Sequence, residues 1–254
     1  MSRLHVSKDF WIGALRVEGQ AFHAAIAEAP LDAPVLSCPE WTVIDLVHHT
    51  GSFHGWLREI LTRGTTEPPA RRPGTAEGLP TGPAVMDWWR EEHDKLVALL
   101  DGVDPEAPAW NWAPQPKRAG FWPRRIAHEV SVHRWDAQMA AAVAEPIETK
   151  LAADGVSEVL DTFLPAGRRA DVRDWRGVVQ LAAVDAAQEW YLRLRGQGMA
   201  LLDTATILDS DDHHARVHAA GSASDLLLAL WGRVGFDVLD VSGEANLLHG
   251  LRTR

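Results

Sequence analysis

Three residues have the types and the spacing to bind one divalent metal ion: His49, Glu129 and His133. Glu129 and His133 are four residues apart, so on a helix their side chains project from one face, as two ligands of one ion must. His49 lies three residues after Leu46 and four before Phe53, which predicts that it faces the same apolar core as they do. Two imidazoles and one carboxylate leave one coordination position open, as in catalytic zinc sites.

The spacing alone leaves a second interpretation open. A glutamate and a histidine four residues apart are common as a helix-stabilising pair, and a histidine on an apolar face is more often a hydrogen-bonded core residue than a ligand. His48 shares a face with Ser52 and is predicted to point aside, and the role of His54 stays open. The histidines of HEVSVH (128–133) are five apart, so this string is not the HExxH motif of zinc proteases.

Four helical segments separated by Pro-rich loops are predicted to position these residues. The second begins with a capping box made by Thr42 and Asp45. A stretch rich in Pro, Gly and Thr, residues 62–83, suits a long surface loop. The pattern predicts a four-helix bundle. Its segments run from about Trp11 to Pro30, from Thr42 to about Ile60, from Val85 to Gly102 and from about Ala119 to Ala144.

The second half of the chain has a different pattern. A short helix around 156–164 is expected, followed by strands, and Ser222 with Asp225 forms a second capping box before a helix through LLLALWGR. The fold class is therefore α+β. We expect an all-α four-helix bundle in residues 1–148 and a small α+β domain in residues 149–254. The expected strands are 177–184, 189–195, 204–208, 215–220 and 236–241, with a last helix ending near Leu251.

The composition excludes several classes of protein. The 254 residues are 46% hydrophobic and 24% charged, which is ordinary globular usage. A formal net charge of −10 disfavours nucleic acid or an anionic membrane as the main partner. We see no signal peptide and no segment that could span a bilayer, so we expect a cytoplasmic monomer or homodimer. The single cysteine, Cys38, is interpreted as structural or incidental.

Several stretches resemble the mycothiol-dependent maleylpyruvate isomerase family. The strongest are CPEWTVIDLVHHTGSFHGW (38–56) and FWPRRIAHEVSVHRWDAQ (121–138). The second half resembles that family's C-terminal domain through DGVSEVLDTF (154–163), GSASDLLLALWGR (221–233) and VSGEANLLHGL (241–251). The resemblance therefore extends over nearly the whole chain.

The resemblance implies a DinB-like metal-binding bundle and a C-terminal domain that helps to close the active site. It implies a divalent ion, Zn²⁺ in our expectation, held by His49, Glu129 and His133. Mycothiol would be the thiol cofactor, its metal-bound thiolate adding to an electrophilic substrate, either for cis-trans isomerisation or for S-transfer. Arg233 matches the family's C-terminal-domain arginine and would meet a carboxylate of the substrate. A solvated arginine at a helix end is the other interpretation of Arg233.

Two other functions remain open at this stage. A metal-dependent hydrolase would activate water at the open position, with Asp136 as a candidate base. A non-catalytic bundle would bind a small ligand without chemistry. The sequence also departs from the family at Thr50, where an apolar residue is usual, and the substrate is not fixed by the resemblance.

Overall fold

The computed structural model describes residues 7–70, 78–171, 173–196, 198–202 and 215–253. The chain forms two compact units, one ending at Glu145 and the other starting at Pro146. The described part of the first is helical, and the second combines helices with a sheet. The protein is therefore α+β, as predicted. None of the described helices has the length and apolarity needed to cross a membrane.

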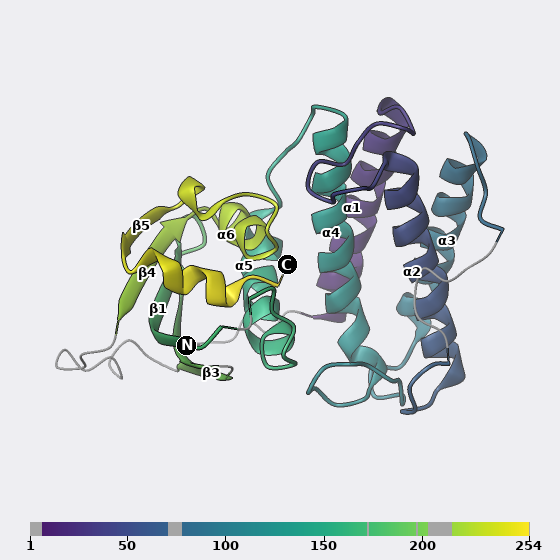
Figure 1. The fold of residues 1–254 in the computed structure, drawn as a ribbon. Helices are drawn as coiled ribbons and strands as arrows, with labels where there is room; N and C mark the ends of the chain where they lie inside the picture. The colour runs from purple at the N-terminus through teal and green to yellow at the C-terminus, as the bar shows by residue number, and fades with distance from the viewer. Residues whose placement is uncertain (1–6, 71–77, 172, 197, 203–214, 254) are drawn as a thin grey trace. The chain divides into compact units, whose positions relative to one another are not determined.

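Four long helices make up the first unit. α1 packs against α4, and α2 packs against α3 (Figure 1). The predicted bundle is thus confirmed, although its fourth helix ends at Ala140 instead of near Ala144. The bounds are α1 (Lys8–Glu28), α2 (Val43–Arg63), α3 (Ala84–Gly102) and α4 (Trp122–Ala140), the last preceded by the 3-10 turn η1 (Ala119–Phe121).

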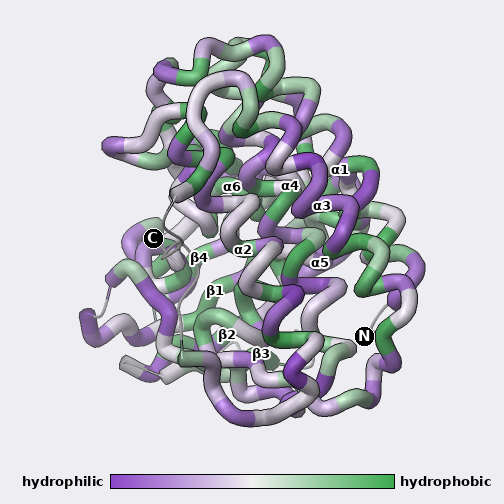
Figure 2. The backbone as a smooth tube through the Cα atoms, turned by 90° about the vertical axis from the view of Figure 1, so that its right-hand side faces the viewer, coloured by the Kyte–Doolittle hydropathy of each residue, from purple (hydrophilic) through white to green (hydrophobic). Residues whose placement is uncertain are grey.

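Local sequence signals begin and end these helices. At the start of α2 the Thr42 backbone N–H donates to the Asp45 carboxylate at 2.9 Å, which confirms the predicted capping box. Pro123 lies in the first turn of α4, where its missing N–H has no partner to lose. Gly64 ends α2 in the left-handed conformation, with φ of 59°. Hydrophobic and hydrophilic residues alternate along the bundle helices, as amphipathic packing requires (Figure 2).

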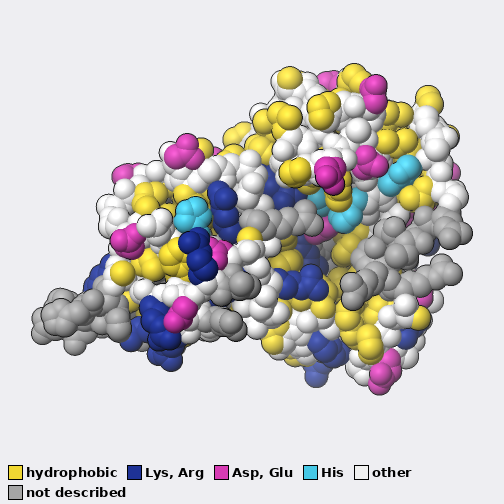
Figure 3. Space-filling view, viewed as in Figure 1, with side chains coloured by type: hydrophobic (Ala, Val, Ile, Leu, Met, Phe, Trp, Pro, Cys, Tyr) yellow, Lys and Arg dark blue, Asp and Glu magenta, His cyan; other side chains and the backbone are white. Residues whose placement is uncertain are grey.

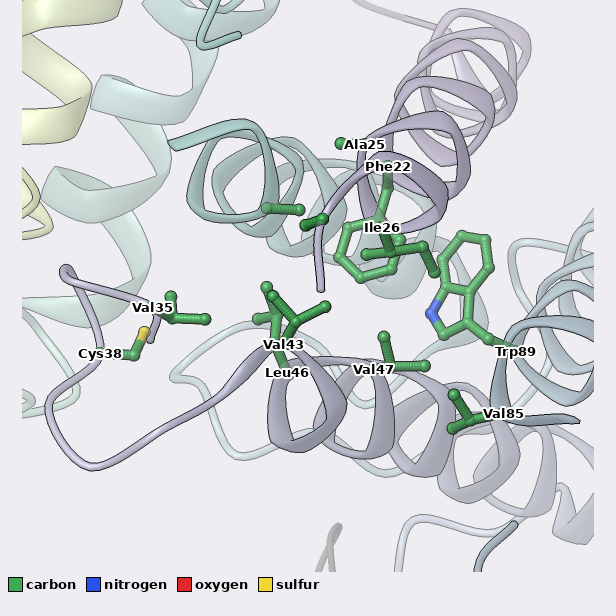
Figure 4. Close-up of a cluster of buried hydrophobic side chains, with 12 residues drawn as sticks. Phe22, Ala25, Ile26, Val35, Cys38, Val43, Leu46, Val47, Val85 and Trp89 are labelled. Carbon is green, nitrogen blue, oxygen red and sulfur yellow. The ribbon is translucent and has the colours of Figure 1, made fainter. Parts of the chain in front are cut away.

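An apolar cluster joins α1, α2 and α3 to the loop before α2 (Figure 4). An isolated bridge between Pro34 and Thr42 closes this loop, which we call the Pro34–Thr42 loop. Val35 and Cys38 point from it into the cluster, against residues of the helices. The thiol of Cys38 is therefore part of the packed interior. The helical members of the cluster include Phe22, Ile26, Val43, Leu46, Val47, Val85 and Trp89.

A group of histidines lies elsewhere in the same bundle. We call His23 of α1, His54 of α2 and His93 of α3 the inner histidine group. The ring centroids of His54 and His93 are 5.3 Å apart, and His93 stacks on Trp89 at 5.0 Å. A Cβ atom on Gly19 of α1 would overlap the His93 ring, so the two helices approach closely because position 19 has no side chain.

The second unit contains a five-stranded sheet, counted over its described residues, in the order β3-β2-β1-β4-β5. The central strand β1 pairs antiparallel with β2 and parallel with β4, and the outer pairs are antiparallel. The strands are β1 (Trp175–Ala183), β2 (Gln188–Gly196), β3 (Gly198–Leu202), β4 (Arg216–Gly221) and β5 (Asp240–Gly243).

Two helices lie on one side of this sheet (Figure 1). α6 packs against β1 and β4, and α5 packs against α6. The Ser222 hydroxyl accepts the Asp225 N–H at 3.0 Å, as expected for the start of α6. The helical elements are α5 (Thr149–Glu158), the π-helical turn η2 (Val159–Phe163), α6 (Ala223–Leu230) and the 3-10 turns η4 (Phe236–Val238) and η5 (Ala245–Leu251).

Some predicted elements of this unit were wrong. The helix expected at 156–164 begins at Thr149, because the Glu148 carboxylate accepts the N–H groups of Lys150 and Leu151 and caps an earlier start. The strand expected at 236–241 is a 3-10 turn followed by the short β5. β3 was not predicted. The strand expected at 204–208 lies outside the described residues.

Candidate metal centre

α2 and α4 bring the three predicted ligands together. The His49 Nε2 atom lies 3.3 Å from Glu129 Oε1, and His133 Nε2 lies 3.4 Å from the same oxygen. One ligand atom from each residue lies within 4.8 Å of the other two. The two imidazole rings have centroids 5.0 Å apart and an interplanar angle of 73°, so they meet edge to face. The arrangement is what helical phase predicted.

These separations fit a bound ion. Metal–ligand bonds of about 2.0–2.2 Å in tetrahedral geometry place neighbouring ligand atoms about 3.4 Å apart. Two imidazole nitrogens and a carboxylate oxygen are also a donor set that zinc accepts. The three side chains therefore fit a divalent metal in both spacing and chemistry.

The site is open on one side. The His133 side chain is 4% exposed and that of Glu129 17%, whereas His49 is 25% exposed. The space-filling view shows histidine side chains reaching the surface of this unit beside acidic and hydrophobic groups (Figure 3). A ligand that exchanges with solvent can approach from the His49 side.

The electrostatics keep the carboxylate charged. Burial alone would raise the pKa of Glu129, but hydrogen bonds with His133 and His49, together with the Arg125 charge, hold its pKa well below the usual value. Burial alone would lower the pKa of His133, but its hydrogen bonds to Asp136 and Glu129 prevail and raise the pKa. Glu129 is therefore an anion at neutral pH, ready to meet a cation.

Charged side chains contact two of the candidate ligands at the atoms that do not face the site. Arg125 Nη2 donates to Glu129 Oε2 at 2.9 Å, which leaves Oε1 facing the histidines. Nδ1 of His133 lies 2.8 Å from Asp136 Oδ2, on the side of the ring away from Glu129. Ser37 Oγ donates to Asp136 Oδ1 at 2.5 Å. Sequence reasoning had not assigned the contacts of Asp136 with His133 and Ser37.

Trp41, in the Pro34–Thr42 loop, packs against both imidazoles. Its ring centroid lies 4.8 Å from that of His49 and 6.3 Å from that of His133, where the two rings are nearly parallel. An indole in this position restricts the motion of both rings. No local pattern in the sequence indicates the contact with His133, because the loop and α4 are distant along the chain.

The other histidines near these segments have different surroundings. His48 Nε2 lies 2.8 Å from the Pro80 carbonyl oxygen, so it is turned aside as predicted. His54 is completely buried in the inner histidine group. The ring of His128 packs at 5.5 Å from that of Trp11 of α1. None of these three belongs to the candidate site.

The structure also explains Thr50, the departure from the family pattern. The Trp89 indole N–H donates to Thr50 Oγ1 at 2.8 Å, and the hydroxyl itself lies 3.0 Å from the Leu46 carbonyl oxygen. A polar residue is thus accommodated in the core because both of its hydrogen-bonding roles are filled. The neighbouring His49 keeps its orientation toward α4.

Arg233 belongs to the second unit. It lies three residues after the end of α6, and its Nη1 donates to the Trp231 carbonyl oxygen at 3.1 Å. Arginine and lysine side chains gather on the visible face of this unit (Figure 3). The position suits either the helix-terminal or the carboxylate-binding interpretation of Arg233.

The fold and the site define a two-unit α+β protein whose helical bundle has three converging ligands for a divalent ion. Sequence comparison assigns its family. Residues 12–138 match the family described as "Mycothiol maleylpyruvate isomerase N-terminal domain", and residues 150–250 match "MDMPI C-terminal domain". The chain belongs to the mycothiol maleylpyruvate isomerase family, which confirms the resemblance seen in the sequence. No curated protein matches the chain.

Solved structures share the fold. The chain is similar to a crystal structure of a histidine-to-alanine mutant of the mycothiol-dependent maleylpyruvate isomerase, with 14% identity and a TM-score of 0.65. A second crystal structure of the mycothiol-dependent maleylpyruvate isomerase gives 16% identity and a TM-score of 0.61. Both alignments cover 96% of this chain and 97% of the other. At this identity the likeness shows a common fold over the aligned 96% of the chain.

Proposed function

We propose that the protein is a metal-dependent enzyme that uses mycothiol to act on an electrophilic small molecule, by cis-trans isomerisation or by S-transfer. The observation that carries the proposal is the convergence of His49, Glu129 and His133, with both imidazole Nε2 atoms 3.3–3.4 Å from Glu129 Oε1. Membership of the mycothiol maleylpyruvate isomerase family supports the thiol and favours isomerisation. We further propose Zn²⁺ as the ion and the cytoplasm as the location.

In this proposal the bundle holds and orients the ion. His49 and His133 would bind it through Nε2 and Glu129 through Oε1. Zinc would supply the positive charge that keeps a thiol deprotonated at neutral pH. Arg125 keeps Glu129 ionised and fixes which oxygen faces the site, since it occupies Oε2. The exposed side of His49 leaves a path for the cofactor, and Trp41 limits the movement of the rings.

The second unit would recognise the substrate. We propose residues 1–148 as the metal-binding domain and residues 149–254 as the domain that helps to close the active site. Arg233 is the proposed substrate-binding catalytic residue, because a guanidinium can hold a carboxylate through two parallel hydrogen bonds. An Arg233→Lys variant keeps the positive charge but loses the two parallel N–H donors of the guanidinium. It should raise the KM for the substrate, and its effect on metal content should be smaller than its effect on KM.

Metal content tests the site. Elemental analysis of purified protein should find about one equivalent of metal. His49→Ala, Glu129→Ala and His133→Ala should each lose it while circular dichroism shows retained helix. Glu18→Gln, which neutralises a buried carboxylate paired with Arg134 at 2.7 Å, is the matched control and should keep the metal. Wild-type protein that stays metal-free after reconstitution would contradict the proposal.

Activity tests the chemistry. Zinc-loaded protein, mycothiol and maleylpyruvate should give the trans isomer, followed by NMR, with the thiol recovered unchanged. A stable thioether in place of the isomer would identify S-transfer. Turnover without any thiol to a product cleaved by water would point to a hydrolase instead.

The structure gives the hydrolase hypothesis no support from its candidate base. Asp136 is fully buried, and its carboxylate contacts the Nδ1 side of His133, opposite the ring nitrogen that faces Glu129. It cannot reach a water molecule at the open position from there. The non-catalytic hypothesis predicts tight ligand binding by metal-free protein, and calorimetry with the protein before and after chelation tests it.

A further inference from the structure

Asp136 is a carboxylate in the interior of the bundle. Its exposed fraction is 0%, and burying a carboxylate is costly unless hydrogen bonds and charges compensate. The compensation comes from different parts of the chain. His133 Nδ1 lies 2.8 Å from Oδ2, and Ser37 Oγ donates to Oδ1 at 2.5 Å. The Cys38 thiol lies 3.7 Å from Oδ2 as a weaker donor.

The contact between Asp136 and His133 determines which nitrogen of the neutral His133 ring carries the hydrogen. Carboxylates lie at both ring nitrogens, but Asp136 is 2.8 Å from Nδ1 whereas Glu129 is 3.4 Å from Nε2, so the one hydrogen of the neutral ring belongs on Nδ1, at the shorter contact. The lone pair of the neutral imidazole is then on Nε2, the atom 3.4 Å from Glu129 Oε1. A carboxylate behind a histidine is a common way to fix the tautomer and the orientation of a metal ligand.

His49 lacks an equivalent support. Over the residues that the structure describes, its Nδ1 has no hydrogen bond, and its ring is restrained by packing against Trp41 at 4.8 Å. Both imidazoles contact Glu129 through Nε2, but His133 is also held by a hydrogen bond at the opposite ring nitrogen, Nδ1. The two histidines are not equivalent parts of the site.

The support for Asp136 comes from the Pro34–Thr42 loop. Ser37 and Asp136 are 99 positions apart in the sequence, so the contact joins the loop directly to α4. The loop is itself restrained, because the Val35 N–H donates to the Trp41 carbonyl oxygen at 2.9 Å. It carries Trp41, which packs on both imidazoles. One loop thus contacts the site at two points. Ser37 donates to Asp136, and the Trp41 ring packs on the two imidazoles.

We propose that Asp136 is a positioning residue, which holds His133 with Nε2 directed at the ion, and that Ser37 holds Asp136 in place. The proposal rests on the proposed metal-binding function. It assigns no chemical step to Asp136. Its consequence is that a loop outside the ligand set determines how tightly the metal is held.

The first test measures zinc affinity by competition with a chelator. Asp136→Asn has the same shape, but its amide can donate to Nδ1 and shift the hydrogen to Nε2, so affinity should fall by about 10- to 100-fold. Ser37→Ala should give a smaller loss in the same direction. Glu18→Gln is the control, since it removes another buried carboxylate charge that pairs with α4 through Arg134. It should leave the affinity unchanged.

The second test uses metal-free protein and so does not depend on the proposed function. The ¹⁵N chemical shifts of His133, measured at a pH that keeps the ring neutral, report which nitrogen carries the hydrogen. Wild type should show hydrogen on Nδ1, and Asp136→Asn should show a larger share on Nε2. If wild type bound no zinc, the proposed function would fail, and this readout would still decide whether Asp136 positions the ring.

Three results would overturn the proposal. The first is Asp136→Asn with wild-type affinity and the wild-type tautomer. The second is an equal loss of affinity in Glu18→Gln, which would show that any buried charge change loosens the site. If Asp136→Asn did not fold, unchanged affinity and tautomer in Ser37→Ala would be the third.

Discussion

Two groups of histidines in one bundle have opposite surroundings. His49 and His133 share the carboxylate of Glu129, and His133 also meets Asp136. In the inner histidine group, His54 and His93 pack against each other and against Trp89, and no described residue bonds either ring nitrogen of His54. The same residue type, at two positions of α2 five residues apart, meets an anion in one place and aromatic rings in the other.

The difference shows in the direction of the pKa shifts. Carboxylates raise the pKa of His133, whereas burial lowers the pKa of His54 well below its usual value. Burial likewise lowers the pKa of His93 to about 4. Acidic partners, more than burial, therefore separate a candidate metal site from a neutral core.

The largest effect, on metal content, should come from replacing one histidine of each group by leucine. His49→Leu should abolish zinc binding, because it removes one of three ligands. His54→Leu should keep full metal content, and its unfolding free energy should stay within about 1 kcal/mol of wild type or rise, since it removes a buried group with no hydrogen bond. Metal analysis and urea unfolding check both. Metal loss in a folded His54→Leu protein would break the comparison.

A second prediction concerns stability at acid pH. His93 has a pKa of about 4 in the folded protein, against about 6.5 when unfolded, so the unfolded chain binds more protons between these values. The contribution of His93 to the unfolding free energy is fully present above about pH 6.5. It falls as the pH drops toward 4, and at pH 5 the loss from this residue alone is about 2 kcal/mol. Burial lowers the pKa of His54 and of His23 as well. The charge of Asp94 acts in the opposite direction on the pKa of His93.

Urea unfolding of metal-free protein at pH 8 and pH 5 measures this loss. His93→Leu should flatten the dependence, whereas His48→Leu, at a half-buried histidine outside both groups, should leave it unchanged. An equally steep loss in His93→Leu would assign the effect to other groups.

The smallest effect should come from replacing Thr50, which lies between His49 and His54 in the sequence. Thr50→Val keeps the shape but leaves the Trp89 indole N–H without its acceptor, at a cost of about 1 kcal/mol in unfolding free energy. Zinc affinity should not change, because the contact lies on the side of α2 that faces α3. Chelator competition beside urea unfolding separates the two outcomes. A tenfold weaker affinity would mean that the groups are coupled.

Much of the fold followed from local patterns. Helical phase placed His49 opposite Glu129 and His133, and capping boxes at Thr42 and Ser222 marked two helix starts, because the groups involved are neighbours in sequence. The family resemblance extended this to both halves. Arg233 stays a prediction from that resemblance.

The failures have a physical cause as well. The contacts of Asp136 with Ser37 and Cys38 depend on a loop almost a hundred residues away, and no periodicity encodes them. The three-residue spacing of His133 and Asp136 is a usable signal in the sequence, because residues three apart share a helix face. In the second unit, β3 is a short edge strand whose partner defines it, so its own five residues carry little pattern.

The contact between Gly19 and His93 has a consequence for how this sequence can vary. Any side chain at position 19 would occupy the space of the His93 ring. An alanine at 19 is therefore compatible only with a smaller residue at 93, and a bulky ring at 93 only with glycine at 19. Among relatives that keep this packing of α1 on α3, the two positions should change together, and an alignment of the family would show them as a covarying pair.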